Sequence, residues 1–118
     1  MGMYSYVRLS ILNADNQQPI EKSEKRKIIQ QLYQDRKVDP KEFASSAFDL
    51  DGNIIDSVTW YKVDENIQSF SQNFPSHIFI VRQRSAEEEF SEEGVYYTSF
   101  QQGQALTFDR NFLDSCFE

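Results

Sequence analysis

The sequence predicts a single α+β domain in which one antiparallel sheet carries two helices on one face. Three observations support this fold class. The chain of 118 residues has about the length of one domain, and 39% of its residues are hydrophobic, which is enough for a buried core. Strand-like alternation and helix-like periodicity also follow one another along the chain. No repeat or low-complexity linker divides residues 1–118, and Met1-Gly2 ahead of Met3 is typical of a cloning remnant.

The first elements are a strand and an amphipathic helix. In residues 4–12, apolar and polar side chains alternate with the period of two that a half-buried strand requires. The helix covers residues 20–37 and ends before VDPKE, because a residue that precedes proline avoids the α region. Its apolar side chains fall about one helical turn apart: Ile28, Ile29, Leu32 and Tyr33.

The segment FDLDGNIID is predicted to be the tip of a hairpin whose strands cover residues 47–50 and 54–61. An Asp-Gly pair between apolar runs favours a tight turn, because both turn positions take positive φ. The alternative is a calcium loop of the EF-hand type with Gly52 at its sixth position. Ala47 and Val58 would then stand first and last, where a carboxylate and a bidentate glutamate are required. We therefore expect a turn and no metal site.

A second helix and three more strands complete the predicted fold. The helix starts with Asp64 as its N-cap and ends before Pro75. The strands cover residues 77–84, 95–100 and 105–108, and the apolar side chains of the tail, Phe112, Leu113 and Phe117, can dock on the core. The order β-α-β-β-α-β-β favours a ferredoxin-like sandwich of the split βαβ type, in which both helices lie on one face of an antiparallel sheet.

Two segments, WYKVDENIQSFSQNFPSHIFIV (60–81) and VYYTSFQQGQA (95–105), resemble a family of small, mostly uncharacterised proteins. These proteins occur in phages and other mobile elements and are related to the YubB ferredoxin-like domain. The shared pattern is a Trp-Tyr pair, an acidic helix start, a serine before an aromatic-proline helix end, and an aromatic strand that ends in Phe and a Gly turn. The matching positions are Trp60, Tyr61, Asp64, Glu65, Ser71, Phe74, Pro75, Phe79, Tyr97, Phe100 and Gly103.

The resemblance covers about residues 60–113, since the tail segment FDRNFL is also similar to the family's closing segment. It implies a ferredoxin-like fold and an origin in a phage, a plasmid or a prophage. It supplies no active-site residues. The chain departs from the family pattern at QRSAEEEFSEE, where relatives have a turn rich in glycine and glutamate.

Charge is distributed unevenly along the chain, whose net charge is −7. Residues 1–40 carry seven basic and five acidic side chains, whereas residues 41–118 carry five and fourteen. Because nucleic-acid affinity comes largely from neutralising phosphates, we expect no direct nucleic-acid binding. Exposed tyrosines on the sheet could stack bases, but the basic motif of ferredoxin-like RNA binders is absent. These tyrosines are Tyr4, Tyr6, Tyr96 and Tyr97.

The acidic run AEEEFSEE is the predicted partner-binding segment. The simpler interpretation is a solvated hairpin loop. The functional interpretation is a negative patch with an apolar anchor, which meets a partner protein with a basic surface. Screening confines such attraction to about 8 Å at physiological ionic strength, so it acts mainly on encounter rate and orientation. The candidate residues are Glu87, Glu88, Glu89, Phe90, Glu92 and Glu93.

The sequence offers little support for catalysis or for a cofactor. His77 is the single histidine, Cys116 the single cysteine, and all four glycines are isolated. A Cys-His pair would require the tail to fold back onto residue 77, so a strand-start histidine and a half-buried cysteine are the favoured interpretation. A lone cysteine suits a cytoplasmic protein, and no apolar run approaches the length of about 20 residues that spans a bilayer.

The function expected from these features is that of a small, non-enzymatic protein-interaction module of phage, plasmid or prophage origin. It would bind through its acidic surface or the open face of its sheet. One alternative is a nucleic-acid-mimicking inhibitor of a host defence or DNA-processing enzyme, of the anti-CRISPR or anti-restriction type. A second alternative is an enzyme of unknown chemistry. An unpaired edge strand would also permit a homodimer.

Overall fold

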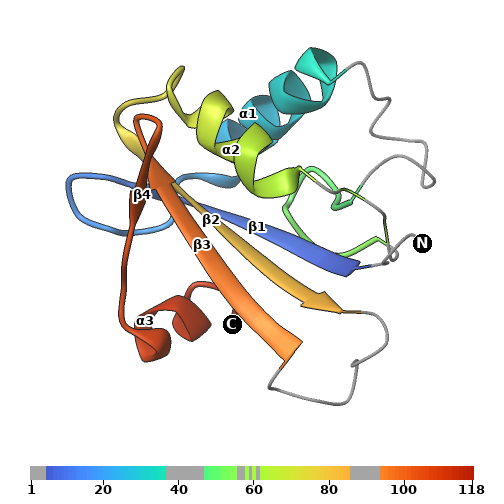
Figure 1. Ribbon diagram of the computed structural model, residues 1–118. Coiled ribbons are helices and arrows are strands. Elements are labelled where there is room, and N and C mark those ends of the chain that lie inside the picture. Colours follow the sequence, from blue (N-terminus) through green and yellow to red (C-terminus); the bar gives the residue numbers. More distant parts are fainter. Residues whose placement is uncertain (1–4, 37–46, 56–57, 59, 61, 86–93) are drawn as a thin grey trace.

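The computed structural model describes residues 5–36, 47–55, 58, 60, 62–85 and 94–118 of the chain. Within these residues, four antiparallel strands form one sheet in the order β1-β2-β3-β4, and three helices accompany it (Figure 1). The strands are β1 (Ser5–Asn13), β2 (His77–Ser85), β3 (Val95–Gln101) and β4 (Gln104–Leu106). The helices are α1 (Lys22–Asp35), α2 (Val63–Ser71) and α3 (Arg110–Ser115).

The prediction of a compact single α+β domain with an antiparallel sheet is confirmed, but the ferredoxin-like order β-α-β-β-α-β-β is wrong. The described elements follow the order β1-α1-α2-β2-β3-β4-α3, and the sheet is a meander. β1 and β2 are direct antiparallel neighbours, with residues paired from Ser5 and Ser85 to Asn13 and His77. Both α1 and α2 therefore belong to a long insertion between two adjacent strands.

A side chain of α1 explains why residues 47–55 are not a strand of this sheet. The buried hydroxyl of Tyr33 donates a hydrogen bond of 2.6 Å to the carbonyl of Phe48 and accepts one of 3.0 Å from its N–H. Because both main-chain groups of Phe48 bond to this side chain, neither is left for a sheet ladder. A single bridge between Phe48 and Ile54 joins the two sides of the turn. Residues 56, 57, 59 and 61 of the expected return strand lie outside the described residues.

α1 and α2 cover the same face of the sheet, as predicted (Figure 1). The odd-numbered residues of β1 point to this face and pack with β2 and the two helices. Full burial of one such side chain stabilises a fold by about 1.5–3 kcal/mol. Because many of them are buried together here, this cluster is the main core. Its members from the strands are Val7, Leu9, Ile11, Phe79, Val81 and Phe100, and those from the helices are Ile28, Ile29, Leu32, Tyr33, Val63, Ile67 and Phe70.

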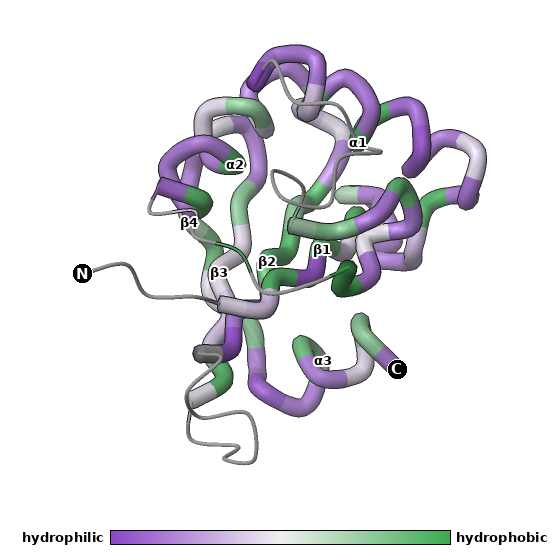
Figure 2. Tube along the Cα trace, turned by 90° about the vertical axis from the view of Figure 1, so that its right-hand side faces the viewer, coloured by the Kyte–Doolittle hydropathy of each residue, from purple (hydrophilic) through white to green (hydrophobic). Residues whose placement is uncertain are grey.

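α3 covers part of the opposite face and adds a third layer to the fold. Figure 2 shows the hydrophobic stretches of β1 and β2 between α1 and α2 on one side and α3 on the other. The predicted docking of the tail is confirmed, because Leu113 is buried against the sheet and Phe112 and Phe117 pack around it. The sheet residues beneath them are Leu12, Ile78 and Ile80. None of the described helices is both long enough and apolar enough to cross a membrane.

Asp64 ties α2 to the sheet, which corrects its predicted role as an N-cap. The helix begins at Val63, after Lys62, and has no side-chain cap. The Asp64 carboxylate instead accepts hydrogen bonds from Gln83 of β2 at 3.0 Å and from Thr98 of β3 at 2.7 Å. A charged acceptor with two side-chain donors fixes the position of α2 over the two strands.

The C-terminal end of α2 is bonded to the β3-β4 turn. Ser71 is fully buried, and its hydroxyl accepts a hydrogen bond of 2.9 Å from the N–H of Gly103. Gln68 donates to the carbonyl of the same glycine at 2.9 Å. Gln102 and Gly103 both have positive φ, as a two-residue hairpin turn of the primed type requires. These hydrogen bonds fix the C-terminal end of α2 to the β3-β4 turn.

We predict that Tyr33→Phe destabilises the protein, because it leaves the two buried main-chain groups of Phe48 without a partner. An unsatisfied buried polar group costs about 1–3 kcal/mol, so the free energy of unfolding should fall by at least that amount in urea denaturation. The matched control is Tyr96→Phe, which removes the same hydroxyl from a side chain that is 51% exposed. Equal stability of the two variants would contradict the role of the Tyr33 hydroxyl.

The stabilisation from Tyr33 should also disappear in alkali. Burial raises the pKa of Tyr33 to about 12, above its ordinary value of 10.0. A pKa that is higher in the folded state gives a stabilisation that is complete below pH 10 and is lost as the pH rises toward 12. The stability difference between wild type and Tyr33→Phe should therefore shrink over this range in urea denaturation at stepped pH. A constant difference would show that Tyr33 ionises as easily folded as unfolded.

Candidate functional site

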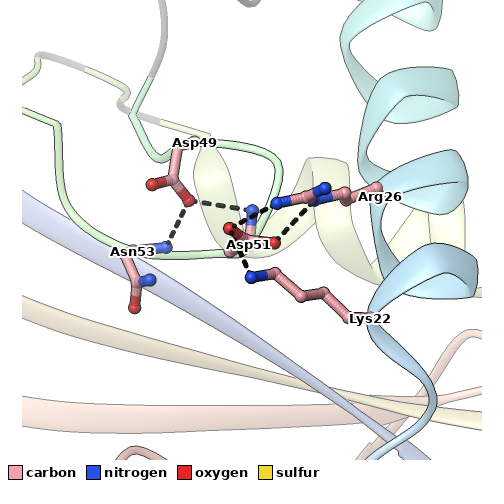
Figure 3. Close-up of polar contacts among 5 residues, drawn as sticks. All are labelled: Lys22, Arg26, Asp49, Asp51 and Asn53. Atoms are coloured by element: carbon pink, nitrogen blue, oxygen red, sulfur yellow. Dashed lines mark hydrogen bonds and ion pairs between the residues drawn. The ribbon is translucent and has the colours of Figure 1, made fainter.

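The Asp-Gly loop is a structural turn in which the protein itself binds both carboxylates (Figure 3). One oxygen of Asp49 accepts hydrogen bonds from the N–H groups of Asp51 at 2.8 Å and Asn53 at 3.0 Å. Gly52 donates to the carbonyl of Asp49 and has a φ of +82°, whereas Asp51 does not have a positive φ. The loop is therefore a turn followed by a single left-handed glycine, not the predicted two-residue turn with positive φ at both positions.

Basic side chains of α1 occupy the position near Asp51 that a calcium ion would need. Arg26 makes a two-point contact with the Asp51 carboxylate, at 2.9 and 3.2 Å, and Lys22 lies 3.6 Å away. The hydrogen bond from Arg26 lowers the pKa of Asp51, and the same bond raises the pKa of Arg26. Within the described residues, no three His, Cys, Asp or Glu side chains are grouped so that they could hold a metal ion.

The register of the sheet gathers positive charge on the face that α3 partly covers. Arg8 of β1 stands directly opposite Arg82 of β2, and Arg82 stands opposite Tyr97 of β3. In the next row of the same face, Tyr6 stands opposite Arg84, whose guanidinium carbon lies 5.1 Å from the centroid of the tyrosine ring. We call Arg8, Arg82, Arg84 and Arg110, the first residue of α3, the arginine cluster.

Part of the arginine cluster lines a cavity of 340 Å³ between the sheet and α3. Three guanidinium groups reach it from three different elements, β1, β2 and α3. Two carboxylates, those of Asp114 and Glu118, are also in its lining. The described residues of its lining are Arg8, Arg82, Val95, Tyr97, Arg110, Asp114, Phe117 and Glu118.

Burial and like charge both act on Arg8. Burial lowers the pKa of Arg8, and the positive charge of Arg82 lowers that pKa further. Like charges directly opposite each other on neighbouring strands destabilise a sheet, so the Arg8–Arg82 pair is a cost to the unliganded protein. A negative charge bound between the two guanidinium groups would remove this cost.

Neutral acceptors hold two of the arginines in place. Arg8 donates to the carbonyl of Phe117 at 3.0 Å and to the side-chain oxygen of Asn53 at 3.3 Å. Arg110 donates to the carbonyl of Val95 at 3.2 Å, and its Nε lies 3.5 Å from Asp114. Carbonyl and amide oxygens orient a guanidinium without neutralising its charge, so the charge of Arg8 remains available to a ligand, whereas Asp114 offsets part of the charge of Arg110.

Two aromatic rings lie among these arginines. The Phe117 ring lies 5.2 Å from the guanidinium carbon of Arg8 and 5.7 Å from the centre of the Tyr97 ring. The Tyr97 ring has the guanidinium of Arg110 at 5.0 Å, and its hydroxyl donates to Asp114 at 2.5 Å. Burial, followed by this hydrogen bond, raises the pKa of Tyr97, so its hydroxyl stays a donor at neutral pH.

The histidine and the cysteine are in separate environments. His77 is the first residue of β2, as predicted, and its Nε2 lies 2.9 Å from a carboxylate oxygen of Glu24. Cys116 is partly buried among the aromatic side chains of the tail, also as predicted, and its sulfur donates to the carbonyl of Phe112. Burial raises the pKa of the Cys116 thiol, which disfavours the reactive thiolate. The geometry therefore offers no Cys-His nucleophile in the described part of the chain.

A second cavity, of 290 Å³, lies between α1 and α2. The guanidinium of Arg36 is at its rim and lies 3.7 Å from the ring centroid of Trp60, whose Nε1 donates to Asn66 at 2.7 Å. Burial lowers the pKa of Arg36. The arrangement stacks Trp60, a position of the family pattern, between the helices. The stacking of Arg36 on Trp60 explains the position of Trp60 in the fold and indicates no particular ligand.

The predicted partner-binding residues Glu87, Glu88, Glu89, Phe90, Glu92 and Glu93 lie outside the described residues, in the connection between β2 and β3. Sequence analysis did not identify the arginine cluster as a site. Arg8, Arg82 and Arg84 each stand at polar positions of alternating strands, so the sequence contained the signal for a common face. The missing information was which strands are neighbours. Of the tyrosines considered as stacking residues, Tyr6 and Tyr97 share this face, whereas Tyr96 points to the other.

Comparison with known proteins gives no assignment. No protein-family model matches the chain, and neither a curated protein nor a solved structure is significantly similar to it.

We predict that Gly52→Ala destabilises the loop between α1 and α2, which packs against β1. A Cβ atom at residue 52 would lie 2.1 Å from the carbonyl oxygen of Leu9, and the residue has a φ of +82°. The backbone strain alone costs about 1–3 kcal/mol, so the melting temperature should fall clearly in a thermal denaturation experiment. Gln30→Ala, at an exposed position of α1, is the control, and equal effects of the two variants would contradict the close packing of Gly52 on β1.

Proposed function

We propose that this protein is a non-catalytic protein-interaction module that binds an acidic segment of a partner on the half of the sheet face beyond α3. The observation that supports this proposal is the arginine cluster, in which Arg8 and Arg82 stand side by side without a described carboxylate between them. Clusters of arginine are a recurrent way in which proteins recognise acidic or phosphorylated segments. Of the two binding surfaces expected from the sequence, this proposal uses the open face of the sheet.

The tail of the chain indicates the chemistry of such a segment. Phe117 lies between Arg8 and Tyr97, and the next residue, Glu118, lines the same cavity as Arg8 and Arg82. An aromatic ring beside a guanidinium gains a cation–π contact, and a carboxylate next to it adds charge complementarity. A partner segment with acidic residues around an aromatic side chain would extend the same contacts toward Tyr6 and Arg84 in the next row of the face.

The acidic run at residues 86–93 stays a second proposed surface, for a partner with a basic patch. The phage, plasmid or prophage origin implied by the family pattern remains part of this proposal. Nucleic-acid mimicry has less support, because it needs rows of free carboxylates. Asp51, Asp64 and Asp114 all accept hydrogen bonds from side chains of the protein itself. They therefore cannot present a phosphate-like row.

We predict that Arg82→Glu weakens binding of a synthetic peptide made of glutamates around one phenylalanine. Reversal of one central charge should weaken binding by about tenfold or more, measured by fluorescence anisotropy of the labelled peptide at constant ionic strength. The fold should survive, because the substitution removes the like-charge pair of Arg8 and Arg82, and the melting temperature should hold or rise.

The matched control is Lys27→Glu, which makes the same change in charge on the exposed side of α1. Unchanged binding of this variant would place the peptide on the arginine cluster. If the two variants weakened binding equally, attraction would be a property of net charge alone. If the wild-type protein did not bind the peptide, the proposed function would be wrong.

A further inference from the structure

We infer that the cavity beside the arginine cluster is a site for a phosphoryl group in the form of a phosphomonoester. This inference rests on the proposed function and names the group that the acidic segment would present. It follows from the number, the direction and the anchoring of the guanidinium groups that line the cavity.

Three arginine side chains line one cavity, which is more than a carboxylate requires. Arg8 comes from β1, Arg82 from β2 and Arg110 from α3, so the three approach from different directions. A carboxylate has two oxygens and matches one guanidinium fork. A phosphomonoester has three terminal oxygens and a charge of about −1.5 to −2 at pH 7, so it can accept hydrogen bonds from all three. The cavity volume of 340 Å³ leaves room for the group together with the atoms that carry it.

The balance of charge at the cavity also matches a dianion. Three arginines and two carboxylates line it, and Asp114 is already engaged with Arg110 and the Tyr97 hydroxyl. Arg84 adds a further positive charge in the next row of the same face, because it lies two residues along β2 from Arg82. Among the side chains that the structure describes, the cavity lining carries a net charge of +1 and Arg84 raises the local sum to +2, in a protein whose net charge is −7.

The arginines are positioned before any ligand arrives. Arg8 and Arg110 bond to main-chain carbonyls of Phe117 and Val95, which restrict both side chains without adding a negative charge. Less rotamer entropy is lost when a ligand binds to side chains that are already held. A phosphodiester of a nucleic-acid strand has a single charge and two free oxygens, so it matches this set of donors less well than a phosphomonoester.

The first test uses inorganic phosphate alone. A ligand that binds only the folded state raises its stability, so phosphate should raise the melting temperature of the wild-type protein above that in chloride at equal ionic strength. Arg82→Gln should lose this increase, whereas Lys27→Gln, on the exposed face of α1, should keep it. A phosphate effect of the same size in Arg82→Gln would overturn the inference, since binding would then be elsewhere. Arg110→Gln provides a second variant from a different element if Arg82→Gln proves unstable.

The second test separates this inference from the proposed function and uses two peptides. Both contain glutamates, one phenylalanine and one serine, and they differ only in phosphorylation of the serine. The phosphorylated peptide should bind about tenfold more tightly or better, and inorganic phosphate should compete with it. If both peptides bound equally through Arg82, the proposed function would stand and the phosphoryl site would fall. If phosphate stabilised the protein through Arg82 but neither peptide bound, the site would stand and the proposed function would fall.

Discussion

The pairing register of β1 with β2 is the constraint on which the rest of the structure depends. It runs antiparallel from Ser5 and Ser85 to Asn13 and His77, and it fixes what each face of the sheet presents. Successive side chains of a strand alternate between faces, so a slip of one residue would turn Val7, Leu9 and Ile11 away from α1 and α2. The same register places Arg8 opposite Arg82. The main core and the arginine cluster are thus two consequences of one alignment.

The insertion between these two strands closes the outer side of β1. Leu9 donates to the carbonyl of Gly52, and Ser5 exchanges two main-chain hydrogen bonds with Val58. On the same strand, Ile11 accepts from the N–H of Ile20. An edge whose main-chain groups are bonded in this way offers little to a second copy of the chain. A homodimer, if it forms, would more readily use another surface than this edge of β1.

Periodicity predicted the elements well, because it depends only on which side chains are apolar. It predicted the helix with Ile28, Ile29, Leu32 and Tyr33 and the strand of Val7, Leu9 and Ile11. The docking of Leu113 was expected from the apolar side chains of the tail, and the helix α3 that carries it was not predicted. What periodicity could not reveal is which elements become neighbours. The described residues of the predicted hairpin form isolated bridges and no continuous strand, and at Phe48 the Tyr33 hydroxyl bonds both main-chain groups.

The candidate site was hidden for the same reason. Arg8 and Arg82 are far apart in the chain, and each occupies a polar position in the alternating pattern of a half-buried strand. Asp64 is a similar case: its place at a helix start suggested an N-cap, whereas its partners are on β2 and β3. The acidic net composition favoured the acidic run as the predicted site and gave no sign of a local excess of arginine. The net charge of a chain says little about one face of the fold.

That contrast between net and local charge bears on how the arginine cluster would select a ligand. At physiological ionic strength, screening limits the effect of a charge to about 8 Å, so an anionic partner feels the whole protein only weakly at a distance. The electrostatic interaction with the arginine cluster becomes strong once the partner is in contact with it, where Arg8, Arg82 and Arg110 line one cavity. Long-range attraction would therefore contribute little to the encounter rate. Selection would depend on short-range geometry, which favours a ligand with as many oxygens as the cavity has guanidinium groups.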